Sequence, residues 1–325
     1  MKPAEPTKNT PQQGFLKLSP QVQQLLFIAV AALTLTPWIS APIALVLGIV
    51  VANVIGNPFP KQAAKGTKYL LQASVVGLGF GIHAQTALQA GSQGFLFTVV
   101  SIFGTLLLGY FMGKLLKVDS KTSQLVSVGT AICGGSAIAA ISPIIQAEQK
   151  QISVSLGIVF ILNSVALFLF PVIGHLLDLS QAQFGLWSAI AIHDTSSVVG
   201  AASEYGPEAL KIATTVKLAR ALWIIPVSFG MAFIYKNSAG KVTIPYFIGW
   251  FVVAMLLNSF IPAVHTESPY IVSVAKAGLT LTLFLIGASL SITMLKSVGP
   301  RAMVQGLVLW VIISVTSLWV VMAVA

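Results

Sequence analysis

Apolar runs long enough to cross a lipid bilayer recur along most of this chain, and they limit its fold more than any other feature. Hydrophobic residues make up 56% of the 325 residues, and only 8% are charged. A hydrocarbon core about 30 Å thick takes roughly 20 apolar residues per helix. Backbone polar groups must be satisfied inside each span, which excludes open sheets, and the alternation of an outer-membrane barrel is absent. The sequence therefore predicts an all-α polytopic membrane protein.

The apolar runs predict about eleven transmembrane helices after a polar N-terminal tail over residues 1–21. They form one transmembrane domain, residues 22–325, with spans near 22–38, 40–57, 68–86, 94–116, 122–146, 152–176, 184–203, 209–235, 243–262, 270–294 and 302–325. If the spans alternate in direction, most Lys and Arg residues fall on the N-terminal side, and the other side holds only Lys150, Lys211 and Lys276. The positive-inside rule then predicts a cytoplasmic N-terminus and a C-terminus on the opposite side of the membrane.

Composition also narrows the expected partners. The net charge of +10 is spread over short loops, without the basic stripe or motif of a nucleic-acid-binding protein. The expected partner is therefore the lipid bilayer and not a nucleic acid. The single cysteine, Cys133, excludes an intramolecular disulfide and a multi-cysteine metal site. No metal or other cofactor is predicted, and homo-oligomerisation is left open.

Three charged residues lie inside apolar runs: Asp194, Lys217 and Arg220. A charge at bilayer depth costs at least ~2.5–3.5 kcal/mol on insertion scales, so it persists where it is paired, hydrated or functional. Two cations and one carboxylate leave this group net positive. An anion is therefore the first substrate to consider.

Asp194 belongs to a polar run in the seventh span, made of His193, Asp194, Thr195, Ser196 and Ser197. If the helix unwinds there, hydroxyls and freed backbone groups can coordinate an ion or an oxyanion. We expect the three hydroxyl residues to bind the substrate, and Asp194 with His193 to form the coupling group for a proton or a cation. The alternative is a buried hydrogen-bond cluster that ties helices together.

Lys217 and Arg220 lie three residues apart in the eighth span, on neighbouring positions of one helix face. The planar fork of arginine suits the oxygens of carboxylate, phosphate or sulfate-like groups, whereas lysine is a point charge. Both are predicted to bind the anion. Two alternatives stay open: Lys217 snorkels toward the interface, or Arg220 neutralises Asp194 as a structural pair.

A third motif, in the fifth span, combines glycines with hydroxyl residues: Thr130, Gly134, Gly135 and Ser136. Paired glycines weaken a helix and allow a ligand to approach closely. A break here would turn the positive N-terminal end of the second half-helix toward an anion, which makes these four residues candidates for substrate binding. Close helix packing through small residues is the alternative. Asn163, in the sixth span, is either a further ligand or a tie between helices.

An internal repeat is also expected. Spans 2–6 and 7–11 are both five helices long, and an odd offset inverts the second set, as in many transporters with discontinuous helices. This repeat pairs residues 130–136 of span 5 with residues 285–289 of span 10. A second pairing, of residues 77–81 of span 3 with the same part of span 10, fits equally well. Topology does not choose between the two.

Taken together, the three motifs resemble the YeiH-type family of bacterial inner-membrane proteins, which are described as sulfate exporters. The resemblance covers residues 22–325 and rests on residues 130–140, 193–199 and 217–223. It implies export of sulfate or a related sulfonate. In plan, that family is similar to the bile-acid and arsenite type transporters, which have two inverted five-helix repeats and crossed broken helices.

The sequence thus favours a secondary transporter that moves a small anion, such as sulfate or an organosulfonate, across the inner membrane by alternating access. One alternative is a cation-coupled carrier or channel centred on Asp194, with Arg220 as counter-charge. Another is a non-transport membrane enzyme or sensor. Enzyme signals are poor, because the sequence has no zinc-type His/Glu spacing, no phosphate-cradling glycine loop and no serine elbow. We therefore predict that the chain is not an enzyme.

Overall fold

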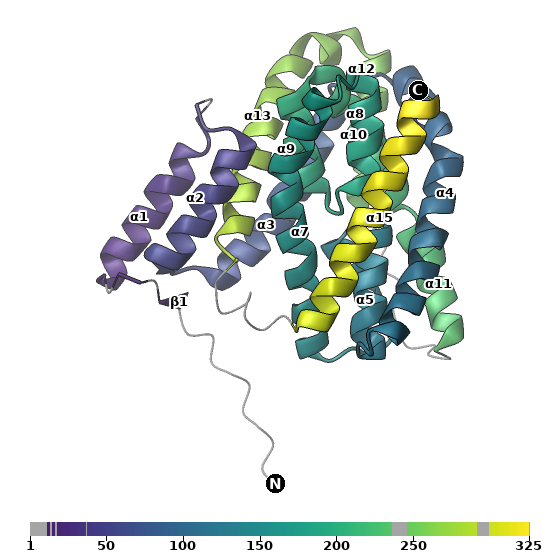
Figure 1. Ribbon diagram of the computed structural model, residues 1–325. Helices are drawn as coiled ribbons and strands as arrows, with labels where there is room; N and C mark the ends of the chain where they lie inside the picture. The colour runs from purple at the N-terminus through teal and green to yellow at the C-terminus, as the bar shows by residue number, and fades with distance from the viewer. Residues whose placement is uncertain are drawn as a thin grey trace.

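The computed structural model describes residues 12–13, 15–16, 18–36, 38–235, 246–290 and 299–324. Helices dominate this part of the chain (Figure 1). In chain order the elements are β1 (Gln12–Gln13), α1 (Pro20–Leu33), α2 (Ala41–Val54), β2 (Gly56–Asn57), α3 (Pro60–Gly79), α4 (Ala84–Leu115), α5 (Ser120–Ala131), α6 (Gly135–Ile141), α7 (Gln149–Leu176), α8 (Gln181–Ala191), α9 (Thr195–Tyr205), α10 (Pro207–Ala221), α11 (Ile224–Ile234), α12 (Tyr246–Phe260), α13 (Pro262–Gly287) and α15 (Pro300–Val324).

The helices agree with the prediction of an all-α membrane protein. Within the described ranges, five helical segments are long and apolar enough to cross a membrane: Leu96–Leu115, Lys150–Leu176, Pro207–Ile234, Pro262–Gly287 and Pro300–Ala323. Three shorter helices, α1, α2 and α12, are also apolar. The predicted number of eleven spans is not confirmed, because the fifth and seventh predicted spans are helical hairpins.

The segment predicted as the fifth span is a hairpin of two short helices. The chain leaves α5 at Ala131 and begins α6 at Gly135. Both ends of the hairpin lie together, because Lys121 Nζ donates to Gln146 O at 2.7 Å. Gln151, in the first turn of α7, likewise donates to Asp119 Oδ1 at 2.8 Å. We call residues 120–146 the first hairpin.

The segment predicted as the seventh span has the same plan. The chain leaves α8 at Ala191 and begins α9 at Thr195. Its two ends also lie together, since the hydroxyl of Tyr205 donates to Leu179 O at 2.5 Å and Glu208 N donates to Gln181 Oε1 at 2.9 Å. We call residues 181–205 the second hairpin.

The prediction that these two segments cross the bilayer is therefore wrong. A half-helix of 11 or 12 residues is about 16–18 Å long at 1.5 Å per residue, which is roughly half of a 30 Å hydrocarbon core. Each hairpin enters, turns at its break and returns to the end of the bundle where it began. The predicted helix breaks are present, but they mark the tips of re-entrant hairpins.

The two hairpins enter from opposite ends of the bundle. Helix α7 follows the first hairpin, and its 28 residues extend about 42 Å at 1.5 Å per residue to the start of the second hairpin. Figure 1 accordingly shows α5 near one end of the molecule and α8 near the other. We call the end where the first hairpin begins the basic end, because it carries Lys114, Lys117, Lys121 and Lys150. The earlier assignment of Lys150 to the opposite side is thereby corrected.

Helices α2, α3 and α13 form a tightly packed panel beside the hairpins (Figure 1). Gly48 of α2 lies so close to α13 that a Cβ there would collide with the carbonyl oxygen of Phe284. A Cβ on Gly77 of α3 would lie 2.8 Å from Ala275 Cβ. In this panel, glycine serves close backbone contact between helices.

The predicted five-helix repeat is not confirmed by this arrangement. In span 10, α13 is continuous to Gly287, and residues 291–298 lie outside the described part of the chain. Gly77 of the alternative pairing packs against the middle of α13 and lies within α3. The segments that share an anatomy are instead the two hairpins, each followed by a long helical segment, α7 or α10–α11.

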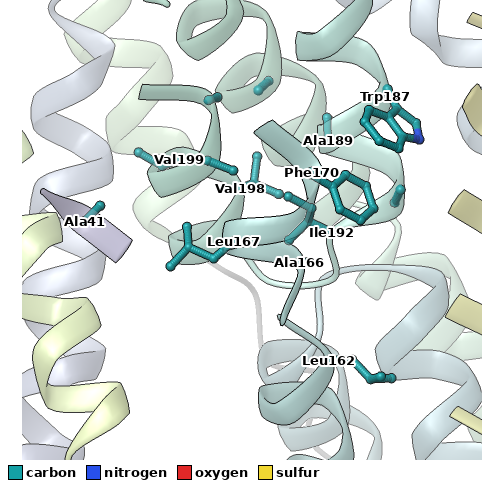
Figure 2. Packing of buried hydrophobic residues seen from close by; sticks show 14 of the residues in the cluster. Ala41, Leu162, Ala166, Leu167, Phe170, Trp187, Ala189, Ile192, Val198 and Val199 are labelled. Atoms are coloured by element: carbon teal, nitrogen blue, oxygen red, sulfur yellow. The ribbon is translucent and has the colours of Figure 1, made fainter. Parts of the chain in front are cut away.

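One core cluster packs α7 against the second hairpin, as Figure 2 shows. Phe170 of α7 stacks on Trp187 of α8, with ring centroids 4.3 Å apart. Val198 of α9 and Leu167 of α7 are fully buried in the same cluster. Inside a membrane such contacts stabilise the fold through close van der Waals packing, because lipid is as apolar as the side chains themselves. Residues along α8 and α9 therefore hold the second hairpin against α7, and the residues at its tip, between the two helices, can make other contacts.

Candidate functional site

The tips of the two hairpins meet inside the bundle. Gly134, at the first tip, has a backbone φ of +64°, which residues other than glycine rarely adopt. A Cβ at this position would lie 3.1 Å from Val159 Cγ1 and 3.3 Å from Asp194 Cβ. Asp194 is the residue at the second tip. The structure thus brings together two motifs that are 60 positions apart in the sequence.

Asp194 is the N-cap of α9. Its Oδ1 accepts from the backbone N of Ser197 at 2.6 Å and from the hydroxyl of Ser196 at 2.8 Å, and its Oδ2 accepts from the hydroxyl of Ser197 at 2.8 Å. An aspartate here satisfies free N–H groups of the first turn and lies at the positive end of the helix. These contacts explain why the helix is interrupted at Asp194 and a new helix begins directly after it.

Lys217 of α10 holds the end of α8. Its Nζ donates to Ile192 O at 2.6 Å and to Ala189 O at 3.2 Å. The side chain is fully buried, so the alternative in which it snorkels to the interface is wrong. The carbonyls at the C-terminal end of a helix have no partner within the helix and carry its partial negative charge. Lys217 satisfies two of them.

Arg220, one turn further along α10, holds the end of α5. Its Nε and Nη2 donate to Ala131 O at 2.8 and 2.5 Å, and its Nη1 donates to the hydroxyl of Ser101 of α4 at 2.9 Å. Arg220 is also fully buried. One helix therefore carries two cations, and each neutralises the C-terminal end of the first helix of one hairpin.

The two cations do not pair with the carboxylate. Within the described ranges, neither Lys217 nor Arg220 forms an ion pair with Asp194, and both donate to backbone carbonyls instead. The alternative of an Arg220–Asp194 structural pair is therefore wrong. The cause is the hairpin geometry, because each tip presents both a C-terminal helix end and an N-terminal helix end at bilayer depth.

Asn163 of α7 ties the second tip in place. Its Oδ1 accepts from the backbone N of His193 at 2.9 Å. In the part of the chain that the structure describes, Asn163 Nδ2, both ring nitrogens of His193 and the hydroxyl of Thr130 are buried without a hydrogen-bond partner. Asn163 is thus a tie between helices and still has a free donor.

The other candidate residues divide between the two tips. Thr195, Ser196 and Ser197 are buried in the first turn of α9. Gly135 begins α6, which has only seven residues, and Ser136 is exposed. Ser136 is therefore not part of the buried cluster at the tips. Cys133 is a buried free thiol beside Gly134.

Sequence reasoning missed Ser101, the side-chain partner of Arg220. It lies in an apolar helix and carries no motif, so only the three-dimensional contact identifies it. A cavity of about 510 Å³ was also not predicted. It lies between α4, α5 and α11, from Lys114, Gln124 and Tyr235 at the basic end to Phe103. Phe103 packs edge-on against Trp223 and lies two residues from Ser101.

No group of three or more His, Cys, Asp or Glu residues in the described ranges is arranged to hold a metal ion. The buried polar groups at the tips are one carboxylate, two cations, an imidazole, an amide and hydroxyls. Together with the long apolar helices, they define the class of protein: a multi-pass α-helical membrane protein with a polar site at the meeting point of two re-entrant hairpins.

Comparison with known proteins gives the family. The sequence model described as "Conserved hypothetical protein 698" matches residues 22–306, so the chain belongs to this family. Relatives named UPF0324 membrane protein include one from Bacteroides thetaiotaomicron, 54% identical over 283 residues and 86% of each chain, and one from Porphyromonas gingivalis, 53% identical over 287 residues and 87% of each chain. A third, from Photobacterium profundum, is 50% identical over 298 residues, 92% of this chain and 91% of that protein.

The names of these relatives state a membrane location and no substrate. They agree with the apolar helices, and the chain is a multi-pass membrane protein of bacterial type. No solved structure matches the chain.

Proposed function

We propose that the protein is a secondary transporter that moves a small anion across the bacterial inner membrane by alternating access. One observation carries this proposal: two re-entrant hairpins from opposite ends of the bundle meet at a site with three buried charges. Irregular backbone at bilayer depth is tolerated where protein buries it or where it lines a water-filled cavity. Transporters use such broken helices near the midplane to bind substrates and coupling ions.

The charge of the site supports an anion. Lys217 and Arg220 outnumber Asp194, so the three buried side chains carry a net charge of one positive unit. A net charge inside a membrane protein is costly, so a positive site favours an anion: a monovalent anion would cancel its charge and a divalent anion would reverse the sign. The resemblance to proteins described as sulfate exporters favours sulfate or an organosulfonate as the substrate. Asp194, with His193, is the proposed coupling group for a proton or a cation.

The alternative centred on Asp194 as a cation ligand has less support. Both oxygens of its carboxylate already accept hydrogen bonds, from Ser196 and Ser197. A cation would have to displace these bonds and approach two buried cations. We therefore favour an anion over a cation as the transported ion.

The basic end is proposed to face the cytoplasm. Lys114, Lys117, Lys121 and Lys150 gather there, as the positive-inside rule requires of cytoplasmic loops. The N-terminus is then cytoplasmic and the C-terminus periplasmic, because the two re-entrant segments cancel in the alternation of spans.

Flux in proteoliposomes tests the proposal. Purified protein reconstituted with radiolabelled sulfate, or with a small sulfonate, is expected to carry the anion. Arg220→Ala should abolish this flux because it releases the end of α5 and removes a buried charge. Lys211→Ala is the matched control, since Lys211 is an exposed cation on the same helix. If neither sulfate nor the sulfonate crosses faster than in protein-free liposomes, the proposed function is overturned.

A further inference from the structure

The buried groups at the hairpin tips fall into two sets with different partners. Asp194, Lys217 and Arg220 all have hydrogen-bond partners within the protein. Among the neutral groups, the hydroxyls of Ser196 and Ser197 donate to Asp194, whereas Asn163 Nδ2, the ring nitrogens of His193 and the Thr130 hydroxyl are buried and unpartnered in the described part of the chain. Leaving a buried polar group without a partner costs about 1–3 kcal/mol. Asn163 and His193 are joined at the second tip, Thr130 lies in the last turn of α5 before the first tip, and the two tips are in contact. Unpartnered polar groups on both sides of this contact point to a ligand.

The orientation of the Asn163 amide follows from its one protein contact. A backbone N–H must donate to an oxygen, so the contact with His193 N identifies the Oδ1 atom and leaves Nδ2 as the free group. Nδ2 has only donor hydrogens. The missing partner of Asn163 is therefore an acceptor.

Thr130 and His193 occupy equivalent places at the two tips. Thr130 precedes Ala131, whose carbonyl accepts from Arg220, and His193 follows Ile192, whose carbonyl accepts from Lys217. Each unpartnered side chain is thus adjacent in the sequence to a backbone carbonyl that a cation holds. A hydroxyl and a neutral imidazole can each donate one hydrogen bond.

The net charge of this region selects the kind of acceptor. Asp194, Lys217 and Arg220 leave one unit of positive charge, and the unpartnered groups add neutral donors. Neutral donors in a positive field suit the oxygens of an oxyanion. Without a direct salt bridge, the anion would be held strongly enough to bind and weakly enough to leave, as passage through a membrane requires.

We infer that Asn163, His193 and Thr130 form the contact site for a small oxyanion, and that Lys217 and Arg220 are positioning residues that hold the hairpin ends. This inference rests on the proposed function, because it names the contacts of the transported anion. It also reverses the sequence-based expectation that the two cations are the main ligands.

The test is the affinity for sulfate of the purified protein, measured by isothermal titration calorimetry. Thr130→Val keeps the shape of the side chain and removes the unpartnered hydroxyl. A lost hydrogen bond to a charged ligand is worth about 1.5–3 kcal/mol, so Kd for sulfate should rise by about tenfold or more. Thr214→Val is the matched control, because the buried Thr214 hydroxyl donates to Leu210 O within its own helix. It should leave Kd unchanged.

Asn163→Asp is the second variant. It keeps an oxygen for the His193 backbone and replaces the free donor with an acceptor, so sulfate binding should be lost. The thermal unfolding midpoint of each variant without sulfate shows whether it folds. If Asn163→Asp does not fold, the pair of threonine variants decides alone.

The outcomes separate the inference from the proposed function. Loss of affinity in Thr130→Val but not in Thr214→Val supports the contact site. Wild-type binding and flux that Thr130→Val and Asn163→Asp leave unchanged would overturn the contact site and leave the transporter standing. A wild-type protein with no saturable binding of sulfate, phosphate or a sulfonate would overturn both.

Discussion

The two hairpins reach the same point with different chemistry at their tips. In the first, α6 begins after Gly134, which has a positive φ and no side-chain cap. In the second, α9 begins after Asp194, whose carboxylate caps the first turn. The first return helix has seven residues and the second has eleven. The first tip depends on backbone freedom and the second on hydrogen bonds.

The cations follow the same division. Arg220 donates three times, to Ala131 O and to Ser101 of the neighbouring α4, whereas Lys217 donates twice, to two carbonyls of α8 and its cap. Arg220 therefore connects the first tip to another helix as well as to α10. Lys217 only joins the second tip to α10. The difference suggests that the first tip depends more on its cation, because its own structure supplies fewer bonds.

The largest expected effect comes from removing either cation. Arg220→Met should loosen the first tip and Lys217→Met the second, each at a cost of about 1.5–3 kcal/mol per lost charge-assisted bond. Arg220→Met should lower the thermal unfolding midpoint more, because it loses more bonds. Limited proteolysis followed by mass spectrometry locates the loosened tip. Cleavage at the same tip in both variants would contradict the assignment of one cation to each tip.

A smaller effect is expected from the glycines of the first tip. Gly134→Ala would force alanine to adopt φ +64° and ψ −125°, a conformation that residues with a side chain rarely adopt, at a cost of about 1–3 kcal/mol. It would also bring the new Cβ to 3.1 Å from Val159 Cγ1. Gly135→Ala is the control, since the nearest atom to its Cβ would be Leu156 Cδ2 at 3.4 Å. Unfolding midpoints should fall for Gly134→Ala and hold for Gly135→Ala. Equal midpoints would contradict the role assigned to Gly134.

The second tip can be tested through its cap. Asp194→Asn keeps an acceptor oxygen for Ser197 N, whereas Asp194→Ala removes it, and loss of an N-cap costs about 0.5–2 kcal/mol. We expect Asp194→Asn to retain most of the stability and Asp194→Ala to lose it. If Asp194 couples transport, both variants lose coupled flux in liposomes. A stable Asp194→Asn protein with wild-type coupling would show that the residue is a cap and no more.

The smallest effect concerns Asp119, at the entrance of the first hairpin. Burial acts to raise the pKa of Asp119, but hydrogen bonds from Thr122 and Gln151 outweigh it and hold this pKa below its usual value. The ionised form therefore stabilises the folded state above the unfolded pKa, near 3.9, and this contribution is lost as the pH falls through the lowered pKa.

Asp119→Asn should accordingly cost at most about 1 kcal/mol at pH 7, the usual size of a cap effect. The difference from wild type should shrink as the pH falls below the unfolded pKa, near 3.9, and through the lowered pKa of the folded protein. Thermal unfolding midpoints of the wild type and of Asp119→Asn, at pH 7 and below about pH 4, measure this difference. A constant difference would show that the charge of Asp119 does not contribute.

The sequence predicted the chemistry of the tips better than their topology. Glycine pairs and a run of polar residues in apolar segments identified both breaks, because each residue type has a local conformational effect. The turn-back could not be predicted, since an apolar run with a central break has the same hydropathy whether it crosses or returns. The contact between Lys121 and Gln146 reveals it, and that contact depends on tertiary structure.

The partners of the cations were beyond sequence reasoning for a related reason. The spacing of Lys217 and Arg220 placed both on one face of a helix, and both do contact the hairpin tips. Side-chain patterns do not show where backbone carbonyls lie free, so the acceptors Ile192 O and Ala131 O had no signal in the sequence. Asn163, by contrast, was recognisable as a polar residue at mid-span, although its tie to His193 was not.

The net positive charge at the tips has an electrical consequence. Moving one elementary charge across a membrane potential takes about 2.3 kcal/mol per 100 mV. In a transport cycle that carries Asp194, Lys217 and Arg220 through the field, an empty site moves as a single positive charge, and a site holding a monovalent anion moves as a neutral body. A divalent anion reverses the sign. With a monovalent anion the membrane voltage would act only on the step in which the empty site moves. With a divalent anion it would act on the loaded step as well. The transport current would therefore report the charge of the transported anion.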